Sequence, residues 1–486
     1  MKKAAAYCRT WWLFRILSPV GDKLREGAIL PVFIVCIFPY LPIERNLMTT
    51  PIIDFVRRYA ERNAARMHMP GHKGRAVIGP EALDITEIRG ADELYHARGV
   101  IRESEENAAA LFGSARTLYS AEGSSLCIRA MLYLALMQGK PPVLLAARNA
   151  HRVLTSAAAL LDIDVRWLYS EENSLLSCPV SPSALDAAIR REQPMAVYLT
   201  SPDYLGHMQD IPALAAVCHA QGVPLLVDNA HGAYLRFLPE DRHPLTLGAD
   251  LCCDSAHKTL SCLTGAAYLH VSKHAPAVFA EQAERALSLF ASTSPSYLIL
   301  QSLDAANAAL ATDFPGQLAN AVHRLSALKG RLAAHGYTLA GEEPMKLTLA
   351  PKSFGCTGDG LHDLLRAQNI ECEFSDPDHL VLMPGPATPD EDWRRVERAL
   401  LAVPRRAAIA DAPPPLPHPA RACSLRQALL SPQAQLPIQD ALGRVLADAH
   451  VGCPPAVPIV TAGEIVDGDA LRCFRYYGFE TCHVIK

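Results

Sequence analysis

The stretch Asp254-Ser255-Ala256-His257-Lys258-Thr259-Leu260 decides how this 486-residue chain is interpreted. It directly follows an apolar run, residues 250–254, of the kind that forms a buried strand. A lysine at a strand end, among small and hydroxyl residues, suits Schiff-base chemistry, because desolvation favours the neutral, nucleophilic amine. The alternative is a solvated loop lysine, since most lysines are exposed. Support for a reactive Lys258 must therefore come from the rest of the chain.

Short apolar runs alternate with helical patterns on both sides of this stretch. The runs lie at residues 142–146, 165–169, 195–200, 224–228, 250–254 and 266–271. Amphipathic segments such as 183–192 and 212–221 lie between most of them. This alternation predicts an α/β fold with a mostly parallel central sheet and helices on both faces. Ligands in such folds bind at the carboxyl ends of the strands.

The pattern changes after about residue 316. The predicted domains are an N-terminal segment (48–110), a large domain (111–316), a small α+β domain (317–403), a Pro-rich linker (404–421) and a C-terminal domain (422–486). Within the small domain we expect two strands, a helix over 360–368, one strand over 371–383 and a last helix over 390–401.

Residues 1–47 fit this organisation poorly. The apolar run 28–42 is short for a membrane span and is broken by Pro31 and Pro39. It also lies late for a signal peptide. An ordinary amphipathic sequence begins at Met48, so we interpret 1–47 as a non-native or disordered extension. A membrane-associating leader is the alternative.

Composition narrows the functional class. The net charge is −4 with both signs interspersed, which does not resemble the basic surface of a nucleic-acid-binding protein. The 14 cysteines are scattered, without paired spacing or a Cys/His cluster at zinc spacing. The cysteine pattern indicates reduced thiols in a cytoplasmic protein and predicts no metal site. From the charge we expect no nucleic-acid partner, and from the short apolar run 28–42 no membrane partner.

Polar residues at other strand ends and helix starts support Lys258. Asp228 ends the apolar run 224–228, where a carboxylate can keep a pyridine nitrogen protonated and so make the ring an electron sink. Gly123-Ser124-Ser125 precedes a helical run, and backbone N–H groups at such a position bind phosphate. His151 follows another run and could stack on a ring. Taken singly, each is more often a cap, a turn or a structural residue.

Ser255 could hold a phosphate oxygen, and His257 could touch a substrate carboxylate. Along the chain the candidates run in the order phosphate cradle, stacking group, pyridinium partner and lysine. This set predicts pyridoxal 5'-phosphate (PLP) as the cofactor.

The sequence resembles the Orn/Lys/Arg decarboxylase family, short form, among the fold type I PLP enzymes with an aspartate-aminotransferase-like fold. The resemblance extends from about Met48 to the C-terminus and is carried by HMPGHKG (68–74), DITE (84–87), TSPDYLG (200–206), DNAHGAYLRF (228–237), SAHKTL (255–260), STSPSYLILQSL (292–303), and residues 437–443 and 454–464. The combination is specific, although no single stretch would be.

The resemblance implies roles for the candidates. Lys258 would form the aldimine with PLP, Asp228 would be the pyridinium partner, and His257 would join them in catalysis. The further cofactor contacts implied are His231 and His151 near the ring, and Gly123, Ser124, Ser125 and Ser255 at the phosphate. The stretch 292–296 resembles one that reaches an active site across a dimer interface, so we expect a homodimer or a higher homo-oligomer. The stretch 68–74 resembles an element near the entrance of the site.

Several positions depart from the family pattern. Asn229 stands where glutamate is common, Arg152 stands where lysine is typical, and 262–263 and 265–266 are variant. These departures leave the core cofactor contacts in place but put the substrate in doubt.

The reaction implied is decarboxylation of arginine, lysine or ornithine. Candidates for binding the distal cation of such a substrate are Asp92, Glu93 and Glu373. Two alternatives stay open. One is another fold type I reaction, such as transamination or β-elimination. The other is a non-catalytic PLP-binding homologue, which the presence of both Lys258 and Asp228 disfavours.

Overall fold

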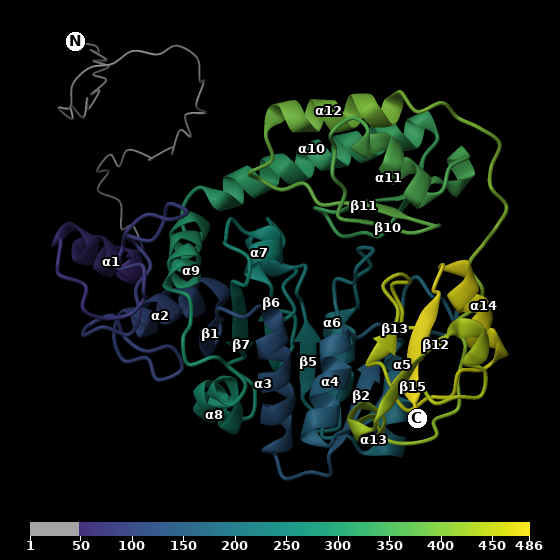
Figure 1. The fold of residues 1–486 in the computed structure, drawn as a ribbon, viewed down its shortest axis with the longest axis horizontal. Coiled ribbons are helices and arrows are strands. Elements are labelled where there is room, and N and C mark those ends of the chain that lie inside the picture. The colour runs from purple at the N-terminus through teal and green to yellow at the C-terminus, as the bar shows by residue number, and fades with distance from the viewer. Residues whose placement is uncertain (1–47) are drawn as a thin grey trace. The chain divides into compact units, whose positions relative to one another are not determined.

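A seven-stranded sheet, here called the large sheet, is the centre of the computed structural model, which describes residues 48–486 (Figure 1). The strand order is β1-β7-β6-β5-β4-β2-β3. β7 runs antiparallel to both of its neighbours, β1 and β6, and all other strand pairs of this sheet are parallel. The predicted α/β fold with a mostly parallel sheet is therefore confirmed. The expectations for residues 1–47 lie outside the described residues.

The large sheet is built from seven short strands. They are β1 (Arg116–Ser120), β2 (Val143–Ala147), β3 (Asp164–Leu168), β4 (Ala196–Thr200), β5 (Leu225–Asp228), β6 (Leu251–Asp254) and β7 (Ala267–Val271). The helices before, between and after them are α1 (Pro51–Glu61), α2 (Val100–Phe112), α3 (Ser124–Leu136), α4 (Arg152–Leu161), α5 (Pro182–Glu192), α6 (Ile211–Ala220), α7 (Ala256–Thr259), α8 (Ala277–Ser288) and α9 (Tyr297–Leu310). A 3-10 helix, η1 (Ala233–Phe237), follows β5.

Both faces of the large sheet are buried along its central strands, which explains why β2, β4 and β5 are almost continuous apolar runs. Side chains alternate between the two faces of a strand. On β5, Leu226 packs in one core cluster with α3 and α4, while Leu225 and Val227 pack in a second cluster with α5 and α6. A sheet covered on both faces selects apolar residues at every position rather than at alternate ones.

A second, four-stranded sheet follows α9 in the chain and has the order β10-β11-β9-β8. Its elements are α10 (Phe314–His335), β8 (Thr338–Ala340), β9 (Leu347–Ala350), η2 (Pro351–Phe354), α11 (Gly358–Arg366), β10 (Phe374–Ser375), β11 (Leu380–Leu382) and α12 (Asp390–Leu401). Figure 1 shows α10 running from the vicinity of α9 to this small sheet, where it lies beside α12.

The prediction of one strand over residues 371–383 is wrong, because β10 and β11 form a hairpin there. The turn between them is held by the carboxylate of Asp376. Its Oδ1 accepts the backbone N–H groups of Asp378 (2.7 Å) and His379 (2.6 Å). Asp residues favour turns in this way, and the Asp-Pro-Asp sequence at 376–378 carried that signal.

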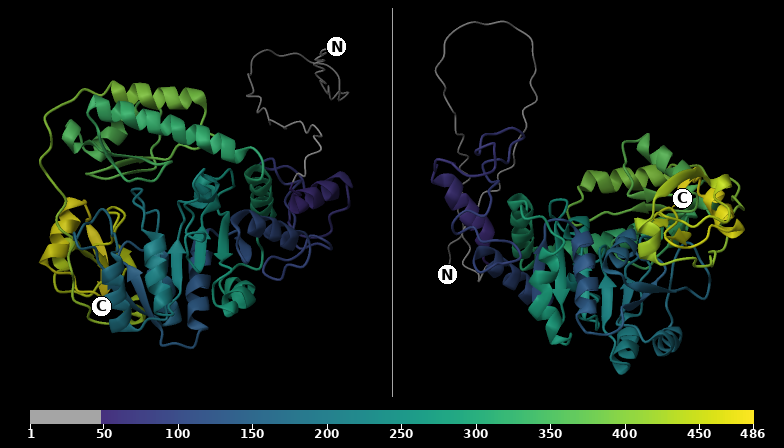
Figure 2. Two further views of the ribbon diagram at one scale, coloured as in Figure 1. Left: turned by 180° about the vertical axis from the view of Figure 1, so that it is seen from behind. Right: turned by 60° about the horizontal axis from the view of Figure 1, so that its bottom comes forward.

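The C-terminal region, yellow in Figure 2, packs beside the large sheet. Its first helix contacts α4. Its elements are α13 (Leu425–Leu430), β12 (Gln433–Pro437), η3 (Ile438–Asp440), β13 (His450–Val451), β14 (Val460–Thr461), α14 (Gly468–Tyr476) and β15 (Thr481–Ile485). Ile459 and Phe474 share a core cluster with Leu145 of β2. Among the described residues, no helix is long and apolar enough to cross a membrane.

One buried ion pair joins this region to the large sheet. Arg148 directly follows β2, and its Nη1 and Nη2 donate to the two carboxylate oxygens of Glu464, each at 2.7 Å. The side chains are 0% and 5% exposed. The guanidinium also donates to the backbone carbonyls of Pro458 (3.3 Å) and Ile459 (3.2 Å). The pair therefore holds residues 458–464 against the strand end that precedes His151.

Replacing Glu464 by glutamine is expected to lower the free energy of unfolding by about 3–5 kcal/mol, because the charge of Arg148 would remain buried without a counter-charge. Denaturant unfolding measures this change. The matched control is Asp186→Asn, which breaks the pair with Arg190, whose side chain is 64% exposed. The control should cost far less, because an exposed ion pair contributes little to stability. Equal losses in the two variants would contradict the importance of the buried pair.

Candidate active site

The chemically interesting residues gather at the carboxyl ends of the central strands. Asp228 ends β5 and Asp254 ends β6, and Lys258 lies on α7, four residues after Asp254. The Nζ atom of Lys258 is 3.1 Å from Nε2 of His231, which follows Asp228 by three residues. The fold thus brings together three of the residues singled out in the sequence.

Asp228 is buried and its carboxylate accepts from three donors, one of which is the thiol of Cys253 at 3.7 Å. Oδ2 of Asp228 accepts the hydroxyl hydrogen of Tyr198 at 3.0 Å, and its Oδ1 accepts the backbone N–H of Ala230 at 3.2 Å. Burial, together with the charge of Asp228, raises the pKa of Tyr198 well above its usual value. Tyr198 therefore remains a hydrogen-bond donor that fixes the orientation of the carboxylate.

The residues expected to form the phosphate cradle lie together in the structure. The Ser255 hydroxyl donates to the Ser124 hydroxyl at 2.8 Å, although the two residues are far apart in the chain. Ser124 begins α3, Ser125 lies in the same first turn, and Gly123 precedes them with φ of +71°. A positive φ at this position favours glycine and turns the chain into the helix. The N–H groups of this first turn and the two hydroxyls could hold a phosphate.

The two remaining histidines of the predicted set are each held by the backbone. His151 caps α4, with its Nδ1 accepting the N–H of Val153 at 3.3 Å. Its pKa is lowered by burial and by Lys258 and Arg152, while Asp228 acts in the opposite direction. His257 is bound through Nδ1 to the carbonyl of Ala266 at 2.9 Å, which fixes its ring beside the start of β7.

Two residues near Lys258 were not found from the sequence. Lys346 is 2% exposed, and its Nζ lies 3.3 Å from Nδ1 of His231. Tyr204 places its ring edge-on to His231, with the centroids 5.3 Å apart. Tyr204 lies in one of the stretches that carried the family resemblance, whereas Lys346 precedes a short strand and had no distinguishing pattern.

The acidic candidates for a distal cation differ in their surroundings. Asp92 accepts the N–H groups of Gly99 (2.7 Å) and Ile101 (3.1 Å), as a residue that caps α2 would. Glu93 is paired with His96. Glu373 accepts the hydroxyl hydrogen of Tyr204 at 3.0 Å and is thereby linked to the neighbourhood of His231.

The stretch 292–296 lies beside Glu122, whereas the stretch 68–74 contacts Tyr59 and is partly exposed. The backbone N–H of Ser292 donates to the Glu122 carboxylate at 2.6 Å, which places this stretch next to the phosphate cradle. His68 is 2.5 Å from the Tyr59 hydroxyl. Met69, within the second stretch, is 67% exposed.

The unusual Asn229 belongs to a buried polar cluster behind the site. Its Nδ2 donates to Oδ1 of Asp254 at 2.7 Å. Oδ2 of Asp254 lies 3.0 Å from Nε2 of His243 and 3.1 Å from Nε2 of His270. Burial alone would raise the pKa of Asp254, but the two imidazoles hold it below its usual value.

This cluster has a geometry that could hold a metal ion, yet hydrogen bonds account for the ring nitrogens of both histidines and for the carboxylate of Asp254. Nδ1 of His243 accepts the N–H of Leu245, and Nδ1 of His270 is 2.8 Å from the Thr117 hydroxyl. The cluster therefore stabilises the strand end that precedes Lys258.

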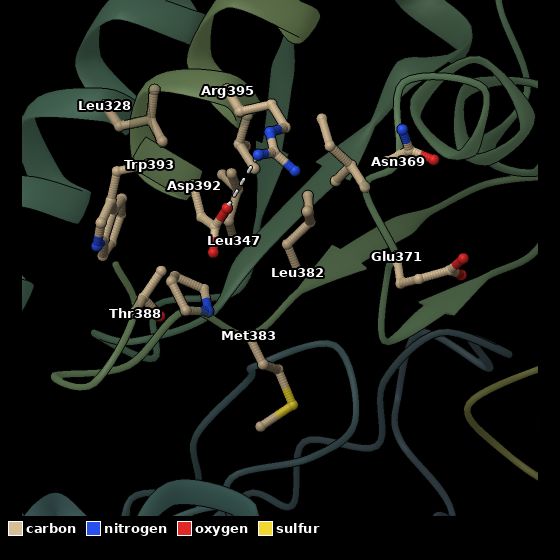
Figure 3. A pocket seen from close by; sticks show the side chains of 13 residues that line it. Leu328, Leu347, Asn369, Glu371, Leu382, Met383, Thr388, Asp392, Trp393 and Arg395 are labelled. Atoms are coloured by element: carbon tan, nitrogen blue, oxygen red, sulfur yellow. Dashed lines mark ion pairs between the residues drawn. The ribbon is translucent and has the colours of Figure 1, made fainter. Parts of the chain in front are cut away.

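One cavity lies at the site, and a second cavity lies next to the first. The first, of about 310 Å³, is lined by Lys258, Tyr234 and Glu343 among others. The second, of about 390 Å³, lies between the small sheet and α12 and is shown in Figure 3, where Asp392, Trp393 and Arg395 come from the helix. The two cavities share Met383, Pro384 and Thr388. Only the first contains a residue predicted to act in catalysis.

Unpaired buried polar atoms near the strand ends fit a polar ligand. Within the described part of the chain, the Thr200 hydroxyl at the end of β4 and both amide atoms of Asn149 beyond β2 have no hydrogen-bond partner. Such groups are costly unless a ligand or water satisfies them. With a hydroxyl pair at a helix start, a buried carboxylate and an amine, the donor set fits PLP.

The fold and this arrangement define the class of PLP enzymes with an aspartate-aminotransferase-like fold. The profile of the family described as Orn/Lys/Arg decarboxylase, major domain, matches residues 50–336. The chain belongs to the Orn/Lys/Arg decarboxylase family, and it is an amino-acid decarboxylase. The family and the fold imply PLP as its cofactor.

Individual relatives agree with this assignment. The chain is 30% identical to an arginine decarboxylase of Halalkalibacterium halodurans, over 88% of this chain and 93% of that protein. It is 28% identical to an arginine decarboxylase of Bacillus subtilis, over 86% and 91%. Among solved structures, the fold is similar to the lysine decarboxylase LdcF of Francisella novicida, with a TM-score of 0.75 and 15% identity over 90% of this chain and 81% of that one.

Proposed function

We propose that this chain converts arginine to agmatine and carbon dioxide, with PLP bound covalently through Lys258. The observation that carries the proposal is the contact between Nζ of Lys258 and Nε2 of His231 at 3.1 Å, beside the buried Asp228. The relatives that are 28–30% identical over most of the chain and are named arginine decarboxylase support arginine among the three basic amino acids.

Each residue of the site has a proposed task. When bound, PLP supplies an electron sink for the electrons of the breaking bond. Asp228, oriented by Tyr198, holds a proton on the ring nitrogen. His151 and His231 pack near the ring, and Ser124, Ser125 and Ser255 bind the phosphate together with the N–H groups after Gly123.

The residues also act on the substrate. The site would have to orient the substrate so that the bond to its α-carboxylate is the one that breaks. Lys258 or His257 then places a proton on Cα after carbon dioxide has left. Since Nδ1 of His257 is bound to the Ala266 carbonyl, its other ring nitrogen is the one that would transfer a proton.

Glu373 is proposed to bind the guanidinium of arginine. Its carboxylate is anchored by Tyr204, which lies beside His231.

Replacing Glu373 by glutamine keeps an acceptor for Tyr204 but removes the charge. We expect KM for arginine to rise by about 10- to 100-fold with a smaller change in kcat, as for the loss of a charged hydrogen bond of about 1.5–3 kcal/mol. Steady-state kinetics measure the change, with Glu371→Gln as the matched exposed control on the same loop. An unchanged KM would remove Glu373 from substrate binding.

The proposed activity is tested by offering arginine, lysine and ornithine separately to the PLP-loaded protein. The expected result is the highest kcat/KM for arginine, with agmatine as the product. Cadaverine or putrescine as the preferred product would change the substrate but keep the reaction. Keto acid without carbon dioxide would favour transamination instead.

A homodimer or higher homo-oligomer is proposed as the working form. Met67, Met69, Val77 and Ile78 are 67–92% exposed and lie close together in the chain. Clusters of exposed large apolar residues mark interaction sites. Light scattering should give a mass at least twice that of the 52.7 kDa chain, and a monomer would contradict the proposal.

A cytoplasmic location and a role in polyamine biosynthesis are proposed as well. The first is supported by the free state of all the described cysteines and the second by the amine product.

A further inference from the structure

Lys346 makes three contacts through one buried amine. Its Nζ is 3.0 Å from the carbonyl oxygen of Asp203, 3.1 Å from that of Tyr204 and 3.3 Å from Nδ1 of His231. The side chain is 2% exposed, so these groups replace its water. An ammonium group has three N–H donors, whereas a neutral amine has two donors and one lone pair. The two carbonyls can only accept, so they occupy two N–H groups in either form.

The third contact of Lys346 therefore depends on where one proton lies. If Lys346 is an ammonium, it donates to Nδ1 of His231. Neutral His231 then carries its hydrogen on Nε2 and donates it to a neutral Lys258 amine. If Lys346 is an amine, it accepts a hydrogen from Nδ1, and Nε2 accepts one from a Lys258 ammonium. The two arrangements contain the same number of protons and use the same three contacts.

His231 can connect these arrangements because it stays neutral. Its pKa lies well below the usual value, owing to burial first and then to Lys346, Lys258, His151 and His257 around it. A neutral imidazole that receives a proton on one nitrogen and releases one from the other moves a charge without becoming an imidazolium at rest. The Tyr204 ring against His231 restricts the imidazole to this orientation.

The surroundings of Lys346 allow both protonation states. Burial lowers the pKa of Lys346, while the nearby carboxyl groups of Glu343 and Asp203 act in the opposite direction. Glu343 is itself buried, and burial raises its pKa. The Lys346 amine is thus neither exposed to water nor tied to one carboxylate by a direct ion pair.

We propose that Lys346 is a positioning residue that stores a proton for Lys258 and exchanges it through His231. In one direction, Lys346 gives a proton to Nδ1 of His231 while Nε2 gives its proton to Lys258. In the other direction, both transfers reverse, and Lys258 becomes the neutral amine that can bind a carbonyl carbon. No oxidant or further reactant is needed. The proposal rests on the proposed role of Lys258, and it adds a residue that touches neither substrate nor cofactor.

The test compares Lys346→Arg with Lys346→Met. Arginine keeps the positive charge but does not give up its proton, whereas methionine removes both charge and donors. If Lys346 acts by exchanging a proton, the two variants should lose the same amount of activity. Two quantities are measured in the full-length protein: the rate at which Lys258 binds PLP at pH 7, followed by absorbance, and kcat. We expect each to fall by about 100-fold, the lower end of general acid–base effects. The KM for arginine should change by less than about 3-fold.

The control is Lys352→Met, which removes another partly buried lysine amine, bonded to Asp378 (2.8 Å) and to the carbonyl of Asp411 (3.0 Å). It should leave both rates near the wild-type values. A Lys346→Arg variant that retains wild-type rates would overturn the proposal, because it would mean that charge alone suffices.

The Lys346→Arg variant could lose activity because the larger side chain packs poorly or because it cannot exchange a proton with His231. A double-mutant cycle distinguishes these two causes. In a His231→Gln background the relay is already broken, so adding Lys346→Arg should have no further effect on either rate. If the fold-losses in rate of the two single variants instead multiply in the double variant, Lys346 acts by packing and the proposal is wrong. If PLP binds to Lys258 but no amino acid is decarboxylated, the proposed function fails, while the PLP-binding rates still decide the role of Lys346.

Discussion

Replacement of Lys258 by alanine is expected to abolish release of carbon dioxide from arginine, with kcat falling by at least about 10⁴-fold, the scale on which loss of a covalent catalytic group acts. The cause is chemical, because alanine has no amine to bind PLP or to return a proton to Cα. The Lys258 side chain is exposed, so its loss leaves no cavity in the core. The unfolding temperature should therefore stay within a few degrees of the wild-type value.

Lys273→Ala is the matched control, since Lys273 is another exposed lysine, just after β7. It should keep full activity. Carbon dioxide release is followed in both variants, together with the absorbance of bound PLP. A Lys258→Ala protein that still decarboxylates within about 10-fold of the wild type would show that another amine carries the cofactor.

Replacement of Asp228 by asparagine is expected to lower kcat by about 10²–10³-fold, as for loss of one preorganised electrostatic group. Asparagine has the same shape. Its carbonyl oxygen can still accept the N–H of Ala230, and Tyr198 can rotate its hydroxyl to accept from the new amide. The fold should survive, whereas a neutral side chain no longer favours a proton on the ring nitrogen.

The control for this variant is Asp250→Asn, at the opposite end of β6. Asp250 is also buried, and it accepts from His219 (3.0 Å) and from the N–H of Leu225 (2.8 Å). Asp250→Asn removes one buried charge and keeps the hydrogen-bond acceptor, as Asp228→Asn does, but it lies away from the proposed active site. Steady-state kinetics on both variants should show a large loss of kcat only for Asp228→Asn, and equal losses would indicate a structural effect.

Much of the large sheet could be predicted because both of its faces are buried. The runs that became β2, β4, β5 and β6 are apolar at successive positions, and few other structures require that pattern. The placing of Asp228 and Lys258 at one sheet edge followed from the same rule, since parallel strands end together. β1 was not predicted. Its pairing with β7 joins residues about 150 positions apart, and no local pattern encodes that partner.

The contacts around the site show where sequence patterns cease to inform. Ser124 and Ser255 were each predicted, and the structure adds that they touch. Lys346 could not be predicted, because a lone lysine before a four-residue strand has no pattern that distinguishes it from a solvated one. Its role depends on a contact with His231 made by folding across 115 positions. The pair of Arg148 and Glu464 is hidden in the same way, because its partners come from different regions of the chain.

The most direct test of the account uses arginine labelled with ¹³C at the carboxylate, given to the PLP-loaded wild-type protein. We expect labelled carbon dioxide and agmatine to appear in equal amounts. Borohydride reduction before substrate is added should leave PLP attached to Lys258 and should stop the formation of both products. Retention of the label in a keto acid, or attachment of PLP at another lysine, would contradict these expectations.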